Sequence, residues 1–305
     1  MTTRSATVRA VARTVRRELL NLAQRRRRDF RAVLQAYALE GLARRIERSH
    51  WRDKVVLRGG LLLGAWLGDT TRVPPRLELL VRGEAPTAEA LDELHQVLAT
   101  TVQPDGLAFA FTEPAPAFVR SPGRTVTRRA LSATLEKAAV NLAVEIGTGD
   151  IIFPAPVEIR IPPLLAAPAP ELLGYRRETA IAETLDALTA GLLSRALEPV
   201  DRLYALSATT DFDAAVLARA IAATFRRRQR KIPQRLLLAD EPTGRTQRRL
   251  ARHWRTLGLG EAQPGPAITF AEAVEAVDAF VGPLLKAMAE PNLALVRWPA
   301  GGPWQ

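Results

Sequence analysis

The chain of 305 residues contains no cysteine and only three histidines, at positions 50, 95 and 253. The absence of cysteine excludes disulfides, thiolate metal sites and a cysteine nucleophile, and three scattered histidines leave little for a zinc site. No apolar run approaches the ~20 residues that a membrane-spanning helix needs, and the N-terminus lacks the apolar core of a signal peptide. We therefore expect a cytoplasmic protein that does not enter a membrane and is long enough for two domains.

Lysine is also scarce, with four residues, so arginine supplies most of the 43 basic side chains. The net charge of +11 is concentrated in two segments: residues 1–31 have ten arginines against two acids, and residues 219–255 have twelve basic residues against two acids. Focused positive charge on an otherwise acidic chain predicts a polyanion partner, and we favour RNA, for instance tRNA. A solvated helix end is the alternative for residues 226–231. The candidate nucleic-acid contacts are Arg25, Arg26, Arg27, Arg28, Arg226, Arg227, Arg228, Arg230 and Lys231.

Hydrophobic periodicity predicts an α+β protein in which a mixed sheet with flanking helices precedes a mainly helical C-terminal half. We divide the chain into basic N-terminal helices at 1–50, a core at 51–160 and a helical domain at 161–305, with the proline-rich run from 154 to 170 as the linker. The expected helices are 5–28, 29–48, 61–67, 88–101, 178–195, 199–208, 213–229, 244–257 and 270–289. The expected strands are 55–57, 76–82, 107–112, 124–135 and 138–146.

The stretch from 55 to 80 carries the strongest chemical signal. A short β-branched strand runs into Gly59 and Gly60 and then into an apolar helical run, which is a turn that lets the backbone approach a phosphate. About ten residues later, Arg76 and Glu78 occupy alternate positions of a predicted strand and so share one face. Two carboxylates at that spacing would hold Mg²⁺ against a triphosphate, because hard cations take oxygen ligands. Here one of the two positions is an arginine.

Several short motifs follow one another in a fixed order from about residue 15 to the end of the chain. They lie at 30–40, 57–60, 105–109, 145–150, 175–183, 220–228 and 298–304. In this order they resemble the AbiEii/AbiGii abortive-infection toxins, which are nucleotidyltransferase-like proteins of type IV toxin–antitoxin systems. The resemblance implies a nucleotidyltransferase-like core, a role in toxin–antitoxin or phage-defence systems with a cognate antitoxin or other protein partner, and, in some members, addition of nucleotides to tRNA acceptor ends.

The resemblance also implies where a site would lie. Arg58, Gly59, Gly60 and Arg76 fall at nucleotide-binding positions. Glu78 and Glu145 fall at catalytic positions, and Glu78, Glu145 and Asp150 at the positions of ligands for Mg²⁺. Three departures from the family pattern each remove a charged group that the family carries: Arg76 replaces a carboxylate, Thr184 replaces a lysine, and a later Lys-Asp pair near Glu198 and Pro199 is missing.

These departures lead us to interpret the chain as a catalytically impaired homologue, a pseudoenzyme that binds nucleotide, RNA or a protein partner. Arginine stays protonated and has no lone pair for a metal, so Arg76 in the site would repel Mg²⁺. Two alternatives stay open. One is an active transferase that uses Mg²⁺ and a nucleoside triphosphate. The other is a scaffold subunit with a vestigial pocket and no cofactor.

Overall fold

The computed structural model describes residues 3–72, 74–100, 105–190, 196–236, 245–260, 267–290 and 295–305. The chain divides into two units, each described here by itself. The first unit comprises residues 1–150 and 156–174, and the second comprises residues 151–155 and 175–305.

The first unit is built on a mixed sheet. Within the described ranges its strands run in the order β3-β5-β6-β2-β1-β8-β7, and β4 also pairs with β5. β1 is antiparallel to β2 and parallel to β8, and β2 is parallel to β6. The strands are β1 (Val55–Arg58), β2 (Arg76–Val81), β3 (Leu107–Phe111), β4 (Ala117–Ser121), β5 (Arg124–Leu135), β6 (Ala138–Thr148), β7 (Val157–Arg160) and β8 (Glu171–Gly174).

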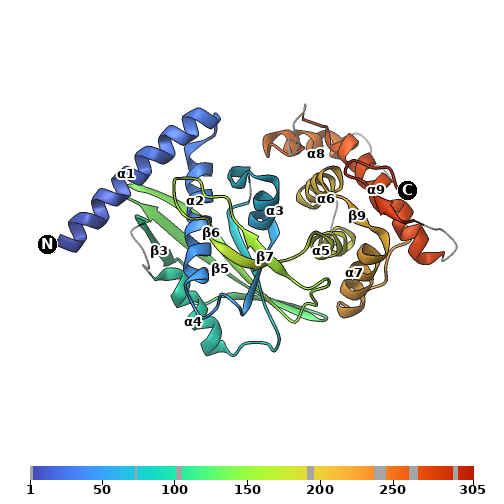
Figure 1. Cartoon of the computed structure of the whole chain (residues 1–305), viewed down its shortest axis with the longest axis horizontal. Helices are drawn as coiled ribbons and strands as arrows, with labels where there is room; N and C mark the ends of the chain where they lie inside the picture. Colours follow the sequence, from blue (N-terminus) through green and yellow to red (C-terminus); the bar gives the residue numbers. More distant parts are fainter. Residues whose placement is uncertain are drawn as a thin grey trace. The chain divides into compact units, whose positions relative to one another are not determined.

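Helices accompany this sheet (Figure 1), and α2 is the one that supplies most to its core. α2 begins where the Asp29 side chain accepts a hydrogen bond from the Arg31 N–H, which satisfies a free donor of the first turn. Its apolar stripe is fully buried and contacts β6 and β8. Two buried charges on α2 are satisfied within the unit: Arg45 pairs with Asp105 at 2.7 Å, and Glu40 accepts from the Leu164 N–H at 2.9 Å. The helices of this unit are α1 (Thr3–Arg26), α2 (Phe30–Glu47), α3 (Gly59–Leu67), the 3₁₀ turn η1 (Thr70–Arg72) and α4 (Ala88–Ala99).

The second unit is mainly helical. α5 packs on α6 and α7, and α9 packs on α6. Residues 151–155 belong to this unit because Phe153 accepts a hydrogen bond from the Thr179 hydroxyl at 2.8 Å and packs under the Arg219 guanidinium. Its elements are α5 (Arg177–Ala190), α6 (Leu197–Thr209), β9 (Phe212–Asp213), α7 (Ala214–Arg227), α8 (Arg245–Thr256), α9 (Phe270–Ala289) and β10 (Arg297–Trp298).

An aromatic cluster closes the second unit. Phe280 on α9 lies 5.3 Å from Phe212 and 4.9 Å from Trp298, measured between ring centroids, and it stacks on Trp304 at 5.9 Å. Both indoles also donate to main-chain carbonyls, Trp298 to Ser207 and Trp304 to Phe280, each at 2.7 Å. Large rings with satisfied N–H groups are strong packing anchors, as the sequence predicts for Trp298 and Trp304.

The mixed sheet and the helical second half confirm the predicted fold class, but the predicted linker is wrong. Residues 157–160 and 171–174 form β7 and β8, which extend the sheet beyond β1. Apart from residues 151–155, the second unit therefore begins at residue 175 and not at residue 161. Each of these strands has only four residues and lies beside prolines, and main-chain pairing creates them, β7 with β8 and β8 with distant β1, so no local pattern reveals them. None of the helices that the structure describes is long and apolar enough to cross a membrane.

Candidate functional site

The turn between β1 and α3 is shaped around the Glu78 carboxylate. Gly59 opens α3 with φ +73°, a conformation that favours glycine. A β carbon at Gly59 would lie 2.1 Å from Glu78 Oε1, so a larger residue would collide with that oxygen. The Gly60 N–H donates to the same oxygen at 3.3 Å. The end of α3 that would receive a phosphate therefore faces a carboxylate, which the helix dipole stabilises.

Four charged residues form one line across the sheet. Arg58 on β1 is paired with Glu78 on β2, Glu78 with Glu145 on β6, and Glu145 with Arg128 on β5. Paired residues of neighbouring strands project from the same face, and their strands lie ~4.8 Å apart. The sequence-predicted residues Arg58, Glu78 and Glu145 are thus brought together on one face.

Arg76 lies on this same face, two residues before Glu78 on β2. Its Nε donates to Glu78 Oε1 at 3.1 Å. The guanidinium side chain, 27% exposed, therefore stands beside the carboxylate that the family resemblance assigns to metal binding and catalysis. A guanidinium in this position would repel a Mg²⁺ ion bound to Glu78.

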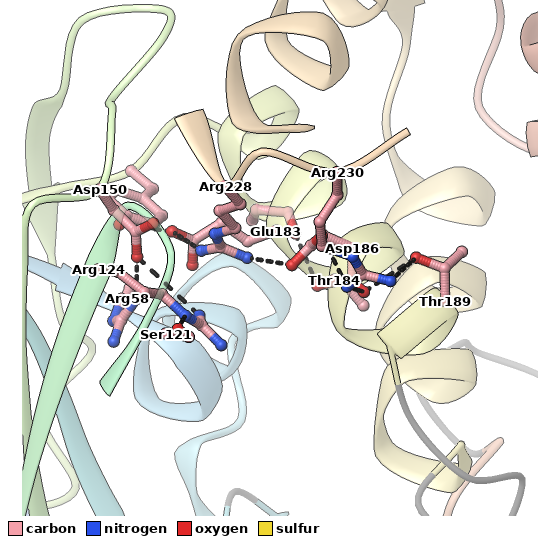
Figure 2. Close-up of polar contacts among 12 residues, drawn as sticks. Arg58, Ser121, Arg124, Asp150, Glu183, Thr184, Asp186, Thr189, Arg228 and Arg230 are labelled. Atoms are coloured by element: carbon pink, nitrogen blue, oxygen red, sulfur yellow. Dashed lines mark hydrogen bonds and ion pairs between the residues drawn. The ribbon is translucent and has the colours of Figure 1, made fainter. Parts of the chain in front are cut away.

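The other two carboxylates also have arginine neighbours. Figure 2 shows Asp150 between Arg58 and Arg124, with nitrogen–oxygen distances of 3.4 and 4.0 Å. The Arg58 guanidinium passes over Gly147, where a β carbon would lie 2.7 Å from Nη2, so only glycine leaves it room. Glu145 Oε1 lies 3.7 Å from Arg128 Nη1. We call these seven residues the sheet-face cluster: Arg58, Arg76, Glu78, Arg124, Arg128, Glu145 and Asp150.

The sheet-face cluster does not fit a Mg²⁺ site. Its four guanidinium groups outnumber its three carboxylates, and each carboxylate lies within 4 Å of an arginine nitrogen. Among the described residues no group of three or more His, Cys, Asp or Glu side chains is arranged to hold a metal ion. An arginine offers hydrogen-bond donors in a planar fork that matches phosphate and carboxylate oxygens. The chemistry that the cluster offers is the binding of an anion.

A second group of charges lies in the helical unit and is buried. Arg228, 3% exposed, donates to Asp186 Oδ2 at 2.7 Å and pairs with Glu183 Oε1 at 2.9 Å. Arg230 Nη1 donates to Asp186 Oδ1 at 2.9 Å (Figure 2). The Tyr175 hydroxyl donates to Glu183 at 3.1 Å. We call these residues the helix cluster: Tyr175, Glu183, Asp186, Arg228 and Arg230.

The helix cluster corrects two predictions: the i, i+3 spacing of Glu183 and Asp186 predicts surface carboxylates, and Arg228 is one of the predicted nucleic-acid contacts. Glu183 and Asp186 are not ordinary solvated carboxylates of a helix surface, because Asp186 is 2% exposed. Arg228 is not an accessible contact for nucleic acid, because its side chain is buried in ion pairs with them. Sequence reasoning missed this cluster because the polar residues Glu183, Thr184 and Thr189 surround Asp186 in α5, and its arginine partners lie 42 and 44 positions away.

The remaining predicted basic contacts fall into two groups. Arg25, Arg26 and Arg27 near the end of α1 are exposed, as are Arg226, Arg227 and Lys231 near the end of α7. Arg28 and Arg230 are partly buried, with Arg28 lying 3.8 Å from Asp69. Thr184, at the position of the family lysine, is buried and donates its hydroxyl to the Ala180 carbonyl at 2.6 Å.

Comparison with known proteins gives one family and a fold. Residues 41–276 match the family model of the nucleotidyl transferase AbiEii toxin of type IV toxin–antitoxin systems. The chain is similar in structure to MenT4, a nucleotidyltransferase toxin from Mycobacterium tuberculosis H37Rv, with 17% identity over 92% of this chain and 89% of that one and a TM-score of 0.56. A protein from H. pylori named as a nucleotidyltransferase matches over 74% of this chain and 91% of its own, with 10% identity and a TM-score of 0.36, too low to carry an argument. No curated protein matches the sequence.

Proposed function

Because this chain belongs to the AbiEii nucleotidyltransferase toxin family of type IV toxin–antitoxin systems, we propose that it binds nucleotide or RNA phosphates through the sheet-face cluster and has lost most or all transferase activity. Within such a system it would act through a bound nucleotide, an RNA or its cognate antitoxin. The proposal keeps the fold and the anion-binding face of the family and gives up the metal-dependent chemistry.

The observation that carries the proposal is the contact between Arg76 Nε and Glu78 Oε1 at 3.1 Å. It puts a permanent positive charge beside one of the two carboxylates that a metal would have to join. Transfer of a nucleotidyl group depends on metal ions to neutralise and align the phosphates. Arginines can neutralise phosphates directly, but they do not replace the metal that activates the attacking oxygen.

The first test asks whether any nucleotide is transferred. Purified protein is incubated with each labelled nucleoside triphosphate, total tRNA and either Mg²⁺ or Mn²⁺, and we expect no incorporation. Incorporation that Glu78→Gln abolishes and Glu158→Gln preserves would overturn the proposal. Glu158 is a suitable control because it is an exposed glutamate on the edge strand β7 of the same unit.

The second test asks whether a triphosphate binds without a metal. Isothermal titration with the same triphosphates should give equal affinities in Mg²⁺ and in EDTA. Arg76→Gln should weaken binding about tenfold, because a charge-assisted hydrogen bond to phosphate is lost. Arg160→Gln, an equal charge change on the exposed edge strand β7, should leave the affinity unchanged. Binding that requires Mg²⁺, or no binding at all, would contradict the proposal.

An active enzyme is a second candidate because Glu78 and Glu145 occupy paired positions on the adjacent parallel strands β2 and β6. If that pair still holds a metal, the wild-type protein should incorporate nucleotide, and Arg76→Asp should raise the rate of incorporation. Adding Thr184→Lys is a poor test, since Thr184 is buried and a lysine would have no room for its charge.

A further inference from the structure

Helix α8 is anchored on one side and carries arginine on the other. Leu250 and Trp254, four residues apart, are buried, and the Trp254 indole N–H donates to the Ile268 carbonyl at 2.8 Å. The Trp254 ring also packs on Phe270 with 5.4 Å between the centroids. These contacts fix which face of α8 is turned outward.

The outward face presents four arginines at exposed positions: Arg248, Arg249, Arg252 and Arg255. The helix sequence contains no acidic residue, and within the part of the chain that the structure describes none of the four pairs with a carboxylate. Arg248, Arg252 and Arg255 follow i, i+4 and i+7 spacing, so they form one stripe with steps of ~6 and ~4.5 Å along the axis. Like charges at this spacing destabilise a helix, so an anion that binds the stripe would relieve their repulsion.

The chemistry of this face favours a phosphate backbone over a protein. Protein interfaces are built around buried aromatic or aliphatic anchors, and the exposed side chains of α8 from 248 to 256 are arginine, histidine and threonine. The nearest exposed large apolar side chain is Leu257, one residue beyond the helix and 55% exposed. A polyanion, in contrast, can bind such a row of charges through the release of counterions and needs no apolar anchor.

We propose that α8 is a docking helix for the sugar–phosphate backbone of RNA, with Arg248, Arg252 and Arg255 as its principal contacts. This proposal rests on the proposed function in one respect only: both take the ligand to carry phosphate groups. It adds a surface outside the two arginine clusters at 25–28 and 226–231, and it does not depend on whether any nucleotide is transferred.

The test measures binding of a labelled 20-nucleotide single-stranded RNA by fluorescence anisotropy at a series of salt concentrations. The variant Arg248→Gln, Arg252→Gln, Arg255→Gln should bind about tenfold more weakly at low salt. The slope of log affinity against log salt should become shallower by about 2, since each phosphate contact contributes about 0.7 for single strands. Replacing the same three arginines by lysine should keep the slope near that of the wild type.

The matched control is Arg48→Gln, Arg82→Gln, Arg160→Gln, which removes the same charge from three exposed positions of the first unit outside both basic segments. It should leave the slope nearly unchanged. Equal losses for the two triple variants would overturn the proposal, because non-specific attraction to the net charge would then explain binding. Thermal unfolding followed by circular dichroism verifies that each variant folds, and the lysine variant keeps the test valid if the glutamine variant does not.

Two further measurements separate this proposal from its alternatives. Leu257→Ser should leave RNA affinity unchanged; a loss of RNA binding in that variant, with the arginine variants intact, would overturn the proposal, because RNA would then be held by an apolar contact and not by the row of charges. Triphosphate affinity should not change in the α8 variant, whereas Arg76→Gln should lower triphosphate affinity and change the salt slope by no more than the ~0.7 of a single phosphate contact. Failure of this proposal and failure of the proposed function therefore give different results.

Discussion

The two arginine–carboxylate clusters of this protein use the same residue types in opposite ways. In the helix cluster, nitrogen–oxygen distances are 2.7 to 2.9 Å and the Arg228 and Asp186 side chains are each 3% exposed. In the sheet-face cluster, the distances within the first unit run from 3.1 to 4.0 Å; Arg58 and Asp150 are buried, but the side chains of the Arg76–Glu78 and Arg128–Glu145 pairs are 14% to 60% exposed. Burial therefore distinguishes these two pairs from the Arg228–Asp186 pair.

That difference separates a structural role from a binding role. A buried charge that loses its partner pays the full cost of desolvation, so the helix cluster must stay intact for the unit to fold. A partly exposed pair is screened by water and contributes little to stability, so its arginines can exchange a carboxylate for a phosphate. The four predictions below test this division, from the largest expected effect to the smallest.

Asp186→Asn should lower the free energy of unfolding by about 3 to 5 kcal/mol, because it leaves the buried Arg228 and the partly buried Arg230 without their shared negative charge. Urea denaturation measures the effect. Glu275→Gln, on an exposed position of α9, is the control and should stay within about 0.5 kcal/mol of the wild type. A loss below 1 kcal/mol for Asp186→Asn would show that burial does not distinguish the two clusters.

His95 extends the comparison to a buried group whose carboxylate neighbour, Asp92, is exposed and 4.0 Å away. Burial, and secondarily the nearby Arg129, lower the pKa of His95 from 6.5 to about 4. The unfolded chain takes up a proton near pH 6.5 and the folded chain only near pH 4, so stability is lost as the pH falls between these values. The loss should be about 2 to 3 kcal/mol between pH 7 and pH 4.

The measurement is urea denaturation at a series of pH values, with His95→Leu as the test variant. That variant should flatten the dependence between pH 6.5 and 4, whereas His253→Leu, at an exposed position of α8, should keep it. Parallel pH profiles for the wild type and His95→Leu would refute the assignment.

Gly59→Ala and Gly68→Ala isolate the role of Glu78 at the turn. Both glycines have nearly the same backbone conformation, with φ of +73° and +75°, and each alanine should cost about 1 to 2 kcal/mol of left-handed strain. A β carbon meets nothing within 4 Å at Gly68 but meets Glu78 at Gly59, so only Gly59→Ala should move that carboxylate. Triphosphate titration should therefore differ from the wild type for Gly59→Ala and agree with it for Gly68→Ala.

Arg76→Gln should change the free energy of unfolding by less than about 1 kcal/mol, because its pair with Glu78 is partly exposed. The same variant should weaken triphosphate binding about tenfold, as stated above. A large loss of stability with unchanged binding would give the sheet-face cluster the structural role that we assign to the helix cluster.

The local sequence pattern was sufficient to predict many of the helices and strands of this structure. The strand, glycine turn and helix at 55–67 and the helices at 29–48 and 270–289 lie within a few residues of the predicted bounds, because apolar spacing and capping residues specify them. The expectation that Arg76 and Glu78 share a face followed from strand alternation, and the contact between them agrees with it. Features set by neighbours in sequence were therefore predictable.

Features set by distant contacts were not. Asp150 reads as a turn residue in sequence, yet it pairs with Arg58, which is 92 positions away. β7 and β8 read as a proline-rich linker because their order comes from distant contacts, which are main-chain pairing with each other and with β1 and packing of β8 on α2. Asp186 reads as a surface acid because its counter-charges, Arg228 and Arg230, lie 42 and 44 positions further on.

The aromatic cluster of the second unit has a consequence for synthesis on the ribosome. Phe212, Phe280, Trp298 and Trp304 pack together, so this core cannot close until residue 304 has left the exit tunnel. The first unit can fold once Gly174 has been released. Until residue 304 follows, the apolar faces of α5, α6 and α7 stay accessible to chaperones and prone to aggregation. The release of residues 298–304 thus determines when the aromatic core of the nascent helical unit can form.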